Sequence, residues 1–266
     1  MEVLVGFIIA LAISLTGVGA GSMTTPILVL LLGLSPATAV GTALAFGAIV
    51  KLISAPVYLL RRNVNLRVLA LLLLGGLPGV IAGGFLLNRF KSSAYDGVLY
   101  AALGSLIVFT AGFHLYRALR PNQRSLATDR SKFLPWLALP IGMEVGFSSA
   151  GAGALGSLLL LSFTPLQAVE VIGTDLCFGL GLSFVGSLIQ VGAGNYDSAL
   201  LVRLVAGGVL GAICGSLLSG KVAQRPLRIG LLLVLIFLGF QLATHKISSQ
   251  PHLKPAITAL MLRRVR

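Results

Sequence analysis

The sequence predicts an all-α polytopic membrane protein, and three features of its composition lead to this fold class. Hydrophobic residues make up 56% of the 266 residues and charged residues only 10%, whereas a soluble domain carries about 25% charged residues. The apolar stretches are long and continuous, unlike the alternating pattern of a β-barrel. The 33 glycines favour close packing between membrane helices. A water-soluble globule and a disordered chain are both excluded, because the chain is too apolar for either.

Eight apolar segments follow one another along the chain. A helix needs about 20 residues to cross the bilayer core, and six of the segments fit one crossing each. The first and the fifth are longer, and each has a glycine cluster in its middle. We therefore expect each of these two to be a broken helix or a helix followed by a re-entrant piece. The segments span residues 3–33, 36–60, 68–88, 95–116, 133–163, 165–193, 198–219 and 227–244.

The basic residues in the loops, at the segment ends and in the C-terminal tail predict the orientation of the chain. If each segment crosses once, 13 basic residues fall on one side of the membrane and five on the other. Cytoplasmic loops are enriched in Lys and Arg, so both termini and the 117–132 loop are then expected in the cytoplasm. If the first and fifth segments are re-entrant, the split becomes 11 to seven. The more polarised split favours eight crossings.

Two halves of the chain match each other at a constant offset of 132. The matches include Thr, Phe and Asn, which distinguishes them from the general similarity of glycine-rich helices. We therefore expect repeat 1 at 1–116, a linker at 117–132, repeat 2 at 133–244 and a basic tail at 245–266. Secondary transporters are often built from such repeats, with the substrate site between them. The aligned pairs include Gly19 and Gly151, Gly41-Thr42 and Gly173-Thr174, Phe46 and Phe178, Asn63 and Asn195, and Gly75-Gly76 and Gly207-Gly208.

Two motifs recur in both halves. The first half contains Gly17-Val18-Gly19-Ala20-Gly21-Ser22-Met23-Thr24-Thr25-Pro26 and Ser35-Pro36 leading to Ala39-Val40-Gly41-Thr42; the second contains Gly151-Ala152-Gly153, Thr164-Pro165, Ala168-Val169 and Gly173-Thr174. In this order the motifs resemble the TauE/SafE family of sulfite and organosulfonate exporters, over nearly the whole chain. The resemblance implies a multi-pass carrier of sulfur-containing or related organic anions in a bacterial inner membrane. Leu158 replaces Pro26 in the second copy, so the halves are expected to contribute unequally.

The glycine clusters are the best candidates for an anion site. A helix broken near the midplane presents backbone N–H groups and the positive end of its dipole, and glycine lets a ligand approach the backbone. Close helix packing, with hydroxyls bonded to their own helix, is the competing interpretation. A Thr in the following crossing of each half could face the site or form a packing notch. The candidate substrate-binding residues are Gly19, Gly21, Ser22, Thr24, Thr25, Thr42, Ser148, Ser149, Gly151, Gly153, Ser157 and Thr174.

Ionisable residues inside the apolar segments form a second set of candidates, since charge within a membrane is costly. Lys51 could attract an anionic substrate, and Asp175 and Glu144 could carry a proton. A structural pair of lysine and carboxylate accounts for the same residues equally well. Glu170 and Arg203 lie near segment ends, where their side chains can reach the interface.

These features together predict a secondary carrier for a small anion such as sulfite, a sulfate-like anion or an organosulfonate, with export expected. A membrane scaffold and an anion channel are the alternatives, and both proton coupling and passive exchange fit. No catalytic constellation, metal-ligand spacing or G-x-x-x-x-G-K-[ST] motif is present, so neither an enzyme nor a cofactor is expected. The expected partners are the anion and the lipid bilayer, with a homo-oligomer left open. Nucleic acid is not expected, because the basic residues lie mostly in short loops.

Overall fold

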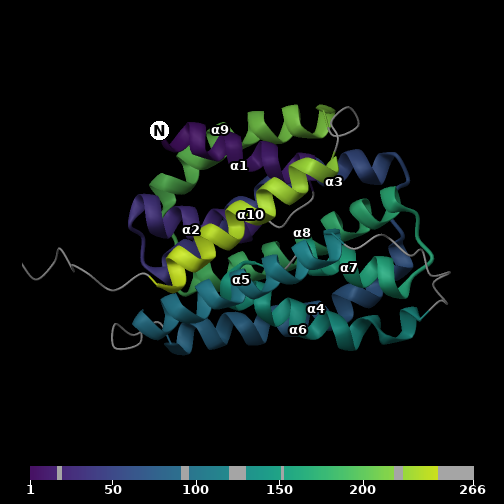
Figure 1. Cartoon of the computed structure of the whole chain (residues 1–266), viewed down its shortest axis with the longest axis horizontal. Coiled ribbons are helices and arrows are strands. Elements are labelled where there is room, and N and C mark those ends of the chain that lie inside the picture. The colour runs from purple at the N-terminus through teal and green to yellow at the C-terminus, as the bar shows by residue number, and fades with distance from the viewer. Residues whose placement is uncertain (17–19, 91–95, 120–129, 151–152, 219–223, 245–266) are drawn as a thin grey trace, which may run out of the picture.

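The structure is a computed structural model, described here for residues 1–16, 20–90, 96–119, 130–150, 153–218 and 224–244, and all its regular elements in these ranges are helical (Figure 1). Within the same ranges, five helices are long and apolar enough to cross a membrane. The helices are α1 (Glu2–Thr16), α2 (Ala20–Leu32), α3 (Pro36–Leu60), α4 (Leu66–Phe90), α5 (Asp96–Leu119), α6 (Leu134–Ser148), α7 (Ala154–Phe163), α8 (Ala168–Gly192), α9 (Ser198–Leu218) and α10 (Gln224–Ala243), with a 3₁₀ turn, η2 (Ser131–Phe133), before α6.

The helix starts carry local signals that explain where they lie. α3 begins with Pro36, whose missing N–H costs nothing in a first turn. α8 begins with a capping box between Gln167 and Glu170. The starts of α4 and α9 are capped alike, because Asn65 Oδ1 accepts from Val68 N at 3.1 Å and Asp197 Oδ1 accepts from Leu200 N at 2.9 Å.

The helices recur along the chain at one offset. α1 and α6 are both 15 residues long and begin at residues 2 and 134. α3 and α8 are both 25 residues long and begin at 36 and 168. α4 and α9 begin at 66 and 198. Each of these pairs therefore shows the offset of 132 that relates the two halves of the sequence.

The bundle has two ends, which we name by the chain segments found there. The N-terminal end holds the starts of α1, α3 and α9 and the ends of α4 and α8; there, Asn195 Nδ2 donates to Asn88 Oδ1 at 2.5 Å. The linker end holds the end of α3 and the starts of α4, α6 and α8; there, Gly173 packs on the backbone of Asn63. α10 ends at the N-terminal end, because Ala243 packs on Gly104 near the start of α5.

The expected first and fifth segments are both helical hairpins. Arg130 N donates to Phe163 O at 3.1 Å, so α7 ends beside the start of α6 at the linker end. α1 runs parallel to α9, since Gly207 packs on Val3 and Gly211 on Phe7. α1 therefore begins at the N-terminal end, where α2 also finishes, shortly before α3 starts.

The two hairpins follow a different path from the long helices. Each hairpin (α1–α2 and α6–α7) returns to the end of the bundle where it began. The remaining long helices, α3, α4, α5, α8, α9 and α10, run between the two ends (Figure 1). An odd number of these helices separates the two hairpins, so the hairpins enter from opposite ends.

Glycines on α4 and α9 hold the hairpins in place. Gly75 and Gly79 of α4 pack on the backbone of α6 at Pro135 and Leu139, as Gly207 and Gly211 of α9 pack on α1. Without side chains, these backbones approach each other directly. The first helix of each hairpin is thus packed against a helix from the other half of the chain.

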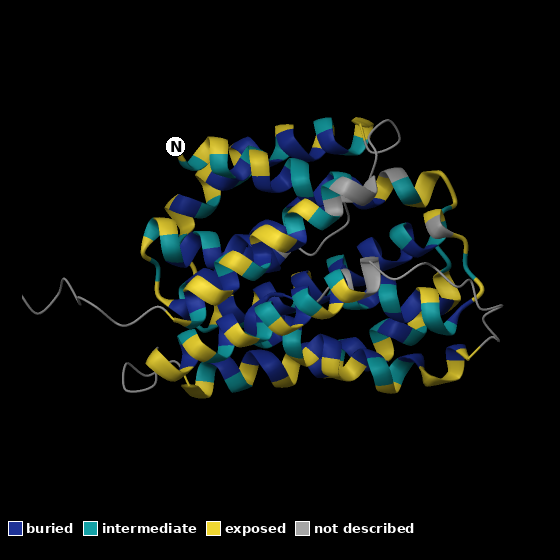
Figure 2. Cartoon of the chain, in the orientation of Figure 1, coloured by how far each residue is buried: buried dark blue, intermediate teal, exposed yellow. Residues whose placement is uncertain are grey.

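The centre of the bundle is formed by α3 and α8, the two most deeply buried of the long helices. Phe46 and Phe178 are fully buried there. Exposed residues lie mainly on the outward faces of the peripheral helices (Figure 2), and they include large apolar side chains such as Phe109, Phe237 and Leu217. Such a surface fits a bilayer, which surrounds the bundle with hydrocarbon.

Candidate functional site

The tips of the two hairpins touch each other inside the bundle. Thr25 Oγ1 of α2 lies 2.5 Å from Ser149 Oγ and also donates to Ser148 O at 3.4 Å. A Cβ added to Gly21 would overlap the backbone of Ser149. All four residues are buried. Segments 123 or more residues apart in sequence are thus brought together at one buried position.

The chain breaks at the second tip for a conformational reason. Ser149 ends α6 in the left-handed region, with φ of 59°, and its N–H bonds to Val145 O at 2.8 Å. Gly153, with φ of 104°, precedes α7, and this conformation strongly favours glycine. Gly153 has no side chain with which to cap α7. The N-termini of α2, at Ala20, and of α7, at Ala154, therefore both lie at the hairpin tips, whereas Gly19 and Gly151 fall outside the described residues.

Three other hydroxyls of the predicted set lie on the short helices α2 and α7. Ser22 and Thr24 of α2 are buried. Ser157 of α7 donates to Gly153 O at 2.7 Å and to Asp175 Oδ2 at 2.6 Å. Asp175 is 2% exposed, and its carboxylate packs against Gly156, where a side chain would overlap it. Asp175 of α8 is thereby joined to the second hairpin.

Lys51 is buried in the centre of the bundle and does not form the direct carboxylate pair that its sequence context allowed. Its Nζ donates to Gly179 O at 3.0 Å and to Ser183 Oγ at 2.9 Å. Among the described residues, the ion pair shorter than 4.0 Å is Arg203 with Glu2, at the N-terminal end. Asp175 is the acidic residue that interacts with the Lys51 charge at longer range. The ammonium therefore donates its hydrogen bonds to neutral groups of α8.

Glu144 lies on α6, one turn before the second tip, and faces α5. Thr110 Oγ1 donates to Glu144 Oε1 at 2.5 Å, and Ser148 Oγ donates to the Glu144 carbonyl at 2.9 Å. His114 follows one turn after Thr110 and is also buried. Glu144 and Asp175 are thus placed on different sides of the second hairpin, one against α5 and one against α8.

Thr42 and Thr174 lie apart from the hairpin tips, each near one end of the bundle. Thr42 Oγ1 accepts from Asp197 N at 3.1 Å at the N-terminal end, and Thr174 Oγ1 accepts from Asn65 N at 3.0 Å at the linker end. Each therefore ties a helix of one half to a loop of the other.

Sequence reasoning missed several hydroxyl residues of this region: Ser183, Thr110, and the pair Ser14 and Ser54 of α1 and α3, whose Oγ atoms are 3.3 Å apart. Isolated Ser and Thr residues in apolar helices carry no distinctive sequence pattern. One signal was present for Ser183, because it stands at the repeat offset of 132 from Lys51. Two equivalent positions are expected to contact each other where the symmetry axis that relates the two halves passes between them.

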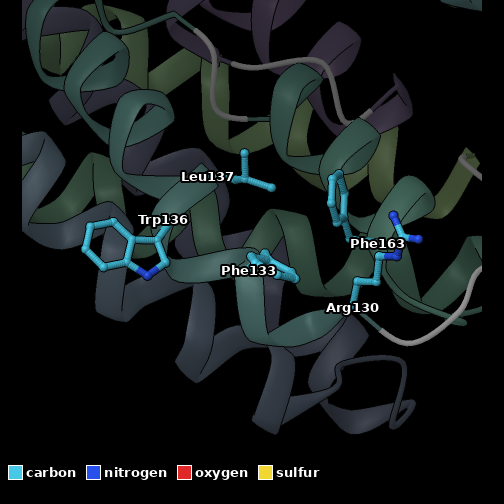
Figure 3. Close-up of a pocket in the computed structure, with 5 residues that line it drawn as sticks. All are labelled: Arg130, Phe133, Trp136, Leu137 and Phe163. Carbon is cyan, nitrogen blue, oxygen red and sulfur yellow. The ribbon is translucent and has the colours of Figure 1, made fainter.

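Two cavities lie at the linker end, away from the tips. The larger, of about 620 Å³, is lined by aromatic and apolar side chains and by Arg130. Figure 3 shows Phe133, Trp136 and Phe163 around it. Trp136 is 78% exposed, as is typical of aromatic residues at a membrane interface. The smaller cavity, of about 100 Å³, lies between the start of α4 and the open end of the second hairpin.

Comparison with known proteins decides the family. The sequence model of the family described as "Sulfite exporter TauE/SafE" matches residues 3–242. The chain belongs to the TauE/SafE family. This membership makes it a membrane transporter, and the family and relatives' names indicate transporters rather than enzymes.

Curated relatives of this TauE/SafE protein come from Bacillus subtilis (strain 168). The probable membrane transporter protein YjnA is 26% identical over 249 residues, which cover 90% of this chain and 98% of YjnA. YdhB is 26% identical and YunE 23% identical, and the matches cover 80% and 90% of this chain and 87% and 95% of theirs. Both are also named probable membrane transporter proteins. No solved structure matches the chain significantly.

Proposed function

We propose that this TauE/SafE protein is a secondary transporter that exports small anions, such as sulfite, sulfate-like anions or organosulfonates, across the inner membrane. The observation that carries the proposal is the contact between the two hairpin tips, where Thr25 meets Ser149. Interrupted helices are tolerated within a membrane only where they are buried in protein or line a cavity. Two interruptions that meet at one buried position are therefore a suitable place for a polar ligand.

The chemistry of this position favours an anion. α2 and α7 both begin at the tips, so the positive ends of two helix dipoles converge there. The buried Lys51 ammonium adds a full positive charge, and no carboxylate of the described residues contacts it directly. We propose that the anion binds among Gly21, Ser22, Thr24, Thr25, Ser148, Ser149, Gly153, Ser157 and Lys51, with Gly19 and Gly151 completing the tips.

Proton coupling is proposed for Asp175 and Glu144. One carboxylate packs against the second hairpin and the other belongs to it, and each accepts a hydrogen bond from a hydroxyl, Ser157 or Thr110. A carboxylate inside a membrane protein readily takes part in proton transfer, because protonation removes the cost of its buried charge. A proton entering with or against the anion would then change the contacts of the hairpin that helps to hold it.

We further propose six crossings and two re-entrant hairpins arranged as inverted repeats. With this topology the linker end carries 11 basic residues and the N-terminal end seven, and this difference supports a cytoplasmic linker end. Both termini then lie on the opposite side. This replaces the expectation that the termini and the 117–132 loop share one side, which depended on the first and fifth segments crossing.

Flux measurements in proteoliposomes test the proposed function. Purified protein is reconstituted, and uptake is measured for sulfite, sulfate and a small sulfonate in the presence and absence of a proton gradient. We expect flux of at least one of these anions by the wild type, strongly reduced flux in Lys51→Met, and normal flux in Arg89→Gln, which removes an exposed arginine at the N-terminal end. Wild-type protein that carries none of the three anions would refute the proposal.

A further inference from the structure

The small cavity at the linker end differs chemically from the large aromatic one beside it. Asn65, Arg67, Ser131 and Thr164 contribute polar side chains to its lining. Its volume of about 100 Å³ corresponds to about three water molecules, which is enough for an oxyanion of four or five heavy atoms. It lies at the opening of the second hairpin, between the start of α4 and the end of α7.

The equivalent position at the N-terminal end has the same backbone geometry but the opposite charge. Asn65 and Asp197 make the same two hydrogen bonds: the side-chain oxygen accepts from the backbone N–H three residues later, and the backbone N–H donates to a threonine of the other half. Two residues later, Arg67 at the linker end corresponds to Ala199 at the other. Asn and Asp cap helices about equally well, so the cap itself does not require the carboxylate.

The surroundings strengthen this difference. At the linker end, the described charged side chains are five exposed cations and Glu170, which closes the cap of α8. At the N-terminal end, Glu2 and Asp197 oppose Arg203 and Arg89, and Arg203 is bonded to Glu2 at 2.8 Å. Among the described residues, an anion is therefore attracted to the linker end and finds no comparable net positive charge at the other. The five cations are Arg61, Arg62, Arg67, Arg130 and Lys132.

We infer that the small cavity is an anion-capture site that loads the transporter from the linker end. Arg67 supplies the charge and bidentate donors for an oxyanion, while Asn65, Ser131 and Thr164 supply neutral polar groups. The inference rests on the proposed anion transport and adds to it the place where the anion is first bound. Because Asp197 and Ala199 replace Asn65 and Arg67 at the N-terminal end, that end lacks an equivalent capture site. With the linker end in the cytoplasm, the anions captured are cytoplasmic ones, as export requires.

Sided flux in membrane vesicles tests the inference. Sulfite transport is measured in inside-out and right-side-out vesicles that contain the full chain, with empty-vector vesicles as background. Asn65→Asp introduces the charge found at the other end while keeping the helix cap, and Arg67→Gln removes the cation. Arg89→Gln, which removes an exposed arginine at the opposite end of the same helix, is the matched control.

We expect both Asn65→Asp and Arg67→Gln to raise the KM for sulfite presented to the linker end about three- to tenfold, the effect of one charge within a few ångströms in a wet environment. The Arg89→Gln protein should keep the wild-type KM at both faces, and the effect of the two linker-end variants should shrink in concentrated salt. An unchanged linker-end KM in a protein with normal flux would overturn this inference alone. Wild-type protein that neither carries nor binds sulfite would overturn the proposed function and this inference together.

Discussion

Replacing Lys51 by methionine separates anion binding from structural stability. The substitution removes hydrogen bonds to Gly179 O and Ser183 Oγ, which are worth about 1 kcal/mol each in net stability. It also removes a buried charge, whose desolvation costs several kcal/mol. Methionine is flexible and apolar enough to fill the space left by the lysine stem. The free energy of unfolding in the absence of anion is therefore expected to change by no more than about 2 kcal/mol in either direction.

The effect on anion binding should be much clearer. A hydrogen bond to a charged group contributes about 1.5–3 kcal/mol, so losing the ammonium should weaken anion binding about 10- to 150-fold. A sulfite concentration of about 100 Kd stabilises the wild type by about 2.7 kcal/mol. The same concentration would stabilise a variant with 30-fold weaker affinity by only about 0.9 kcal/mol. Thermal unfolding of purified protein with and without sulfite measures this difference directly.

Two results would refute this reasoning. If Lys51→Met retains the full sulfite-dependent stabilisation, the ammonium does not contact the anion. If transport is lost in Lys51→Met and restored in the Lys51→Met, Asp175→Asn double variant, Lys51 serves only to balance the charge of Asp175. Arg89→Gln, at an exposed position of the N-terminal end, is the control for loss of one positive charge.

Three further predictions concern glycines and topology. Gly76→Val and Gly208→Val should each lower the free energy of unfolding by about 1–3 kcal/mol. A Cβ at Gly76 would lie 2.5 Å from the ring of Phe178, and a Cβ at Gly208 would lie 2.5 Å from the ring of Phe46. Similar melting curves for both variants and the wild type would contradict this. Gly153→Ala should cost about 1–3 kcal/mol from backbone strain, since φ is 104°, and should also reduce sulfite-dependent stabilisation; a variant that loses stability yet keeps the full sulfite response would place the anion elsewhere. In a chain without Cys177 and Cys214, single cysteines at Met1 and Arg130 should be labelled by an impermeant reagent from opposite sides, whereas labelling of both from one side would restore the eight-crossing topology.

Much of the helical framework could be predicted from hydropathy and glycine spacing alone. The expected segment at 36–60 has the bounds of α3, because Ser35-Pro36 marks the start of the helix and Arg61-Arg62 follow its end. The existence of a break in the first and fifth segments was also predictable, since each was too long for one crossing and had glycines in its middle. These features are local, and local sequence determines them.

Whether a broken segment crosses the membrane or returns is not a local property. A crossing and a hairpin have the same length and hydropathy, and they differ in which distant residues their ends contact. The bond from Arg130 N to Phe163 O brings the two ends of the second hairpin together, and no periodicity indicates it. Counting basic residues favoured eight crossings, but the count itself depends on the topology given to these two segments.

The same limit applies to the candidate site. Lys51 and Asp175 stood out as charges in apolar segments, yet their partners are a backbone carbonyl and two serines, which carry no recognisable pattern. Thr42 and Thr174 were conspicuous because they match at the offset of 132. The match reflects equivalent bonds to Asp197 N and Asn65 N, near opposite ends of the bundle.

The two halves of the chain match at their packing glycines but differ in charge at the centre of the bundle, and this difference has a physical reason. Lys51 and Ser183 are equivalent positions at the offset of 132, and they contact each other at 2.9 Å. A lysine in both would bring two ammonium groups within a few ångströms, where their repulsion amounts to about 4 kcal/mol even at an intermediate dielectric constant of about 20. At a position that contacts its own counterpart, a duplicated chain can keep one such charge and needs a neutral partner for it. The proposed anion site is therefore served by one lysine, while the paired glycines, which carry no charge, are free to remain alike in both halves.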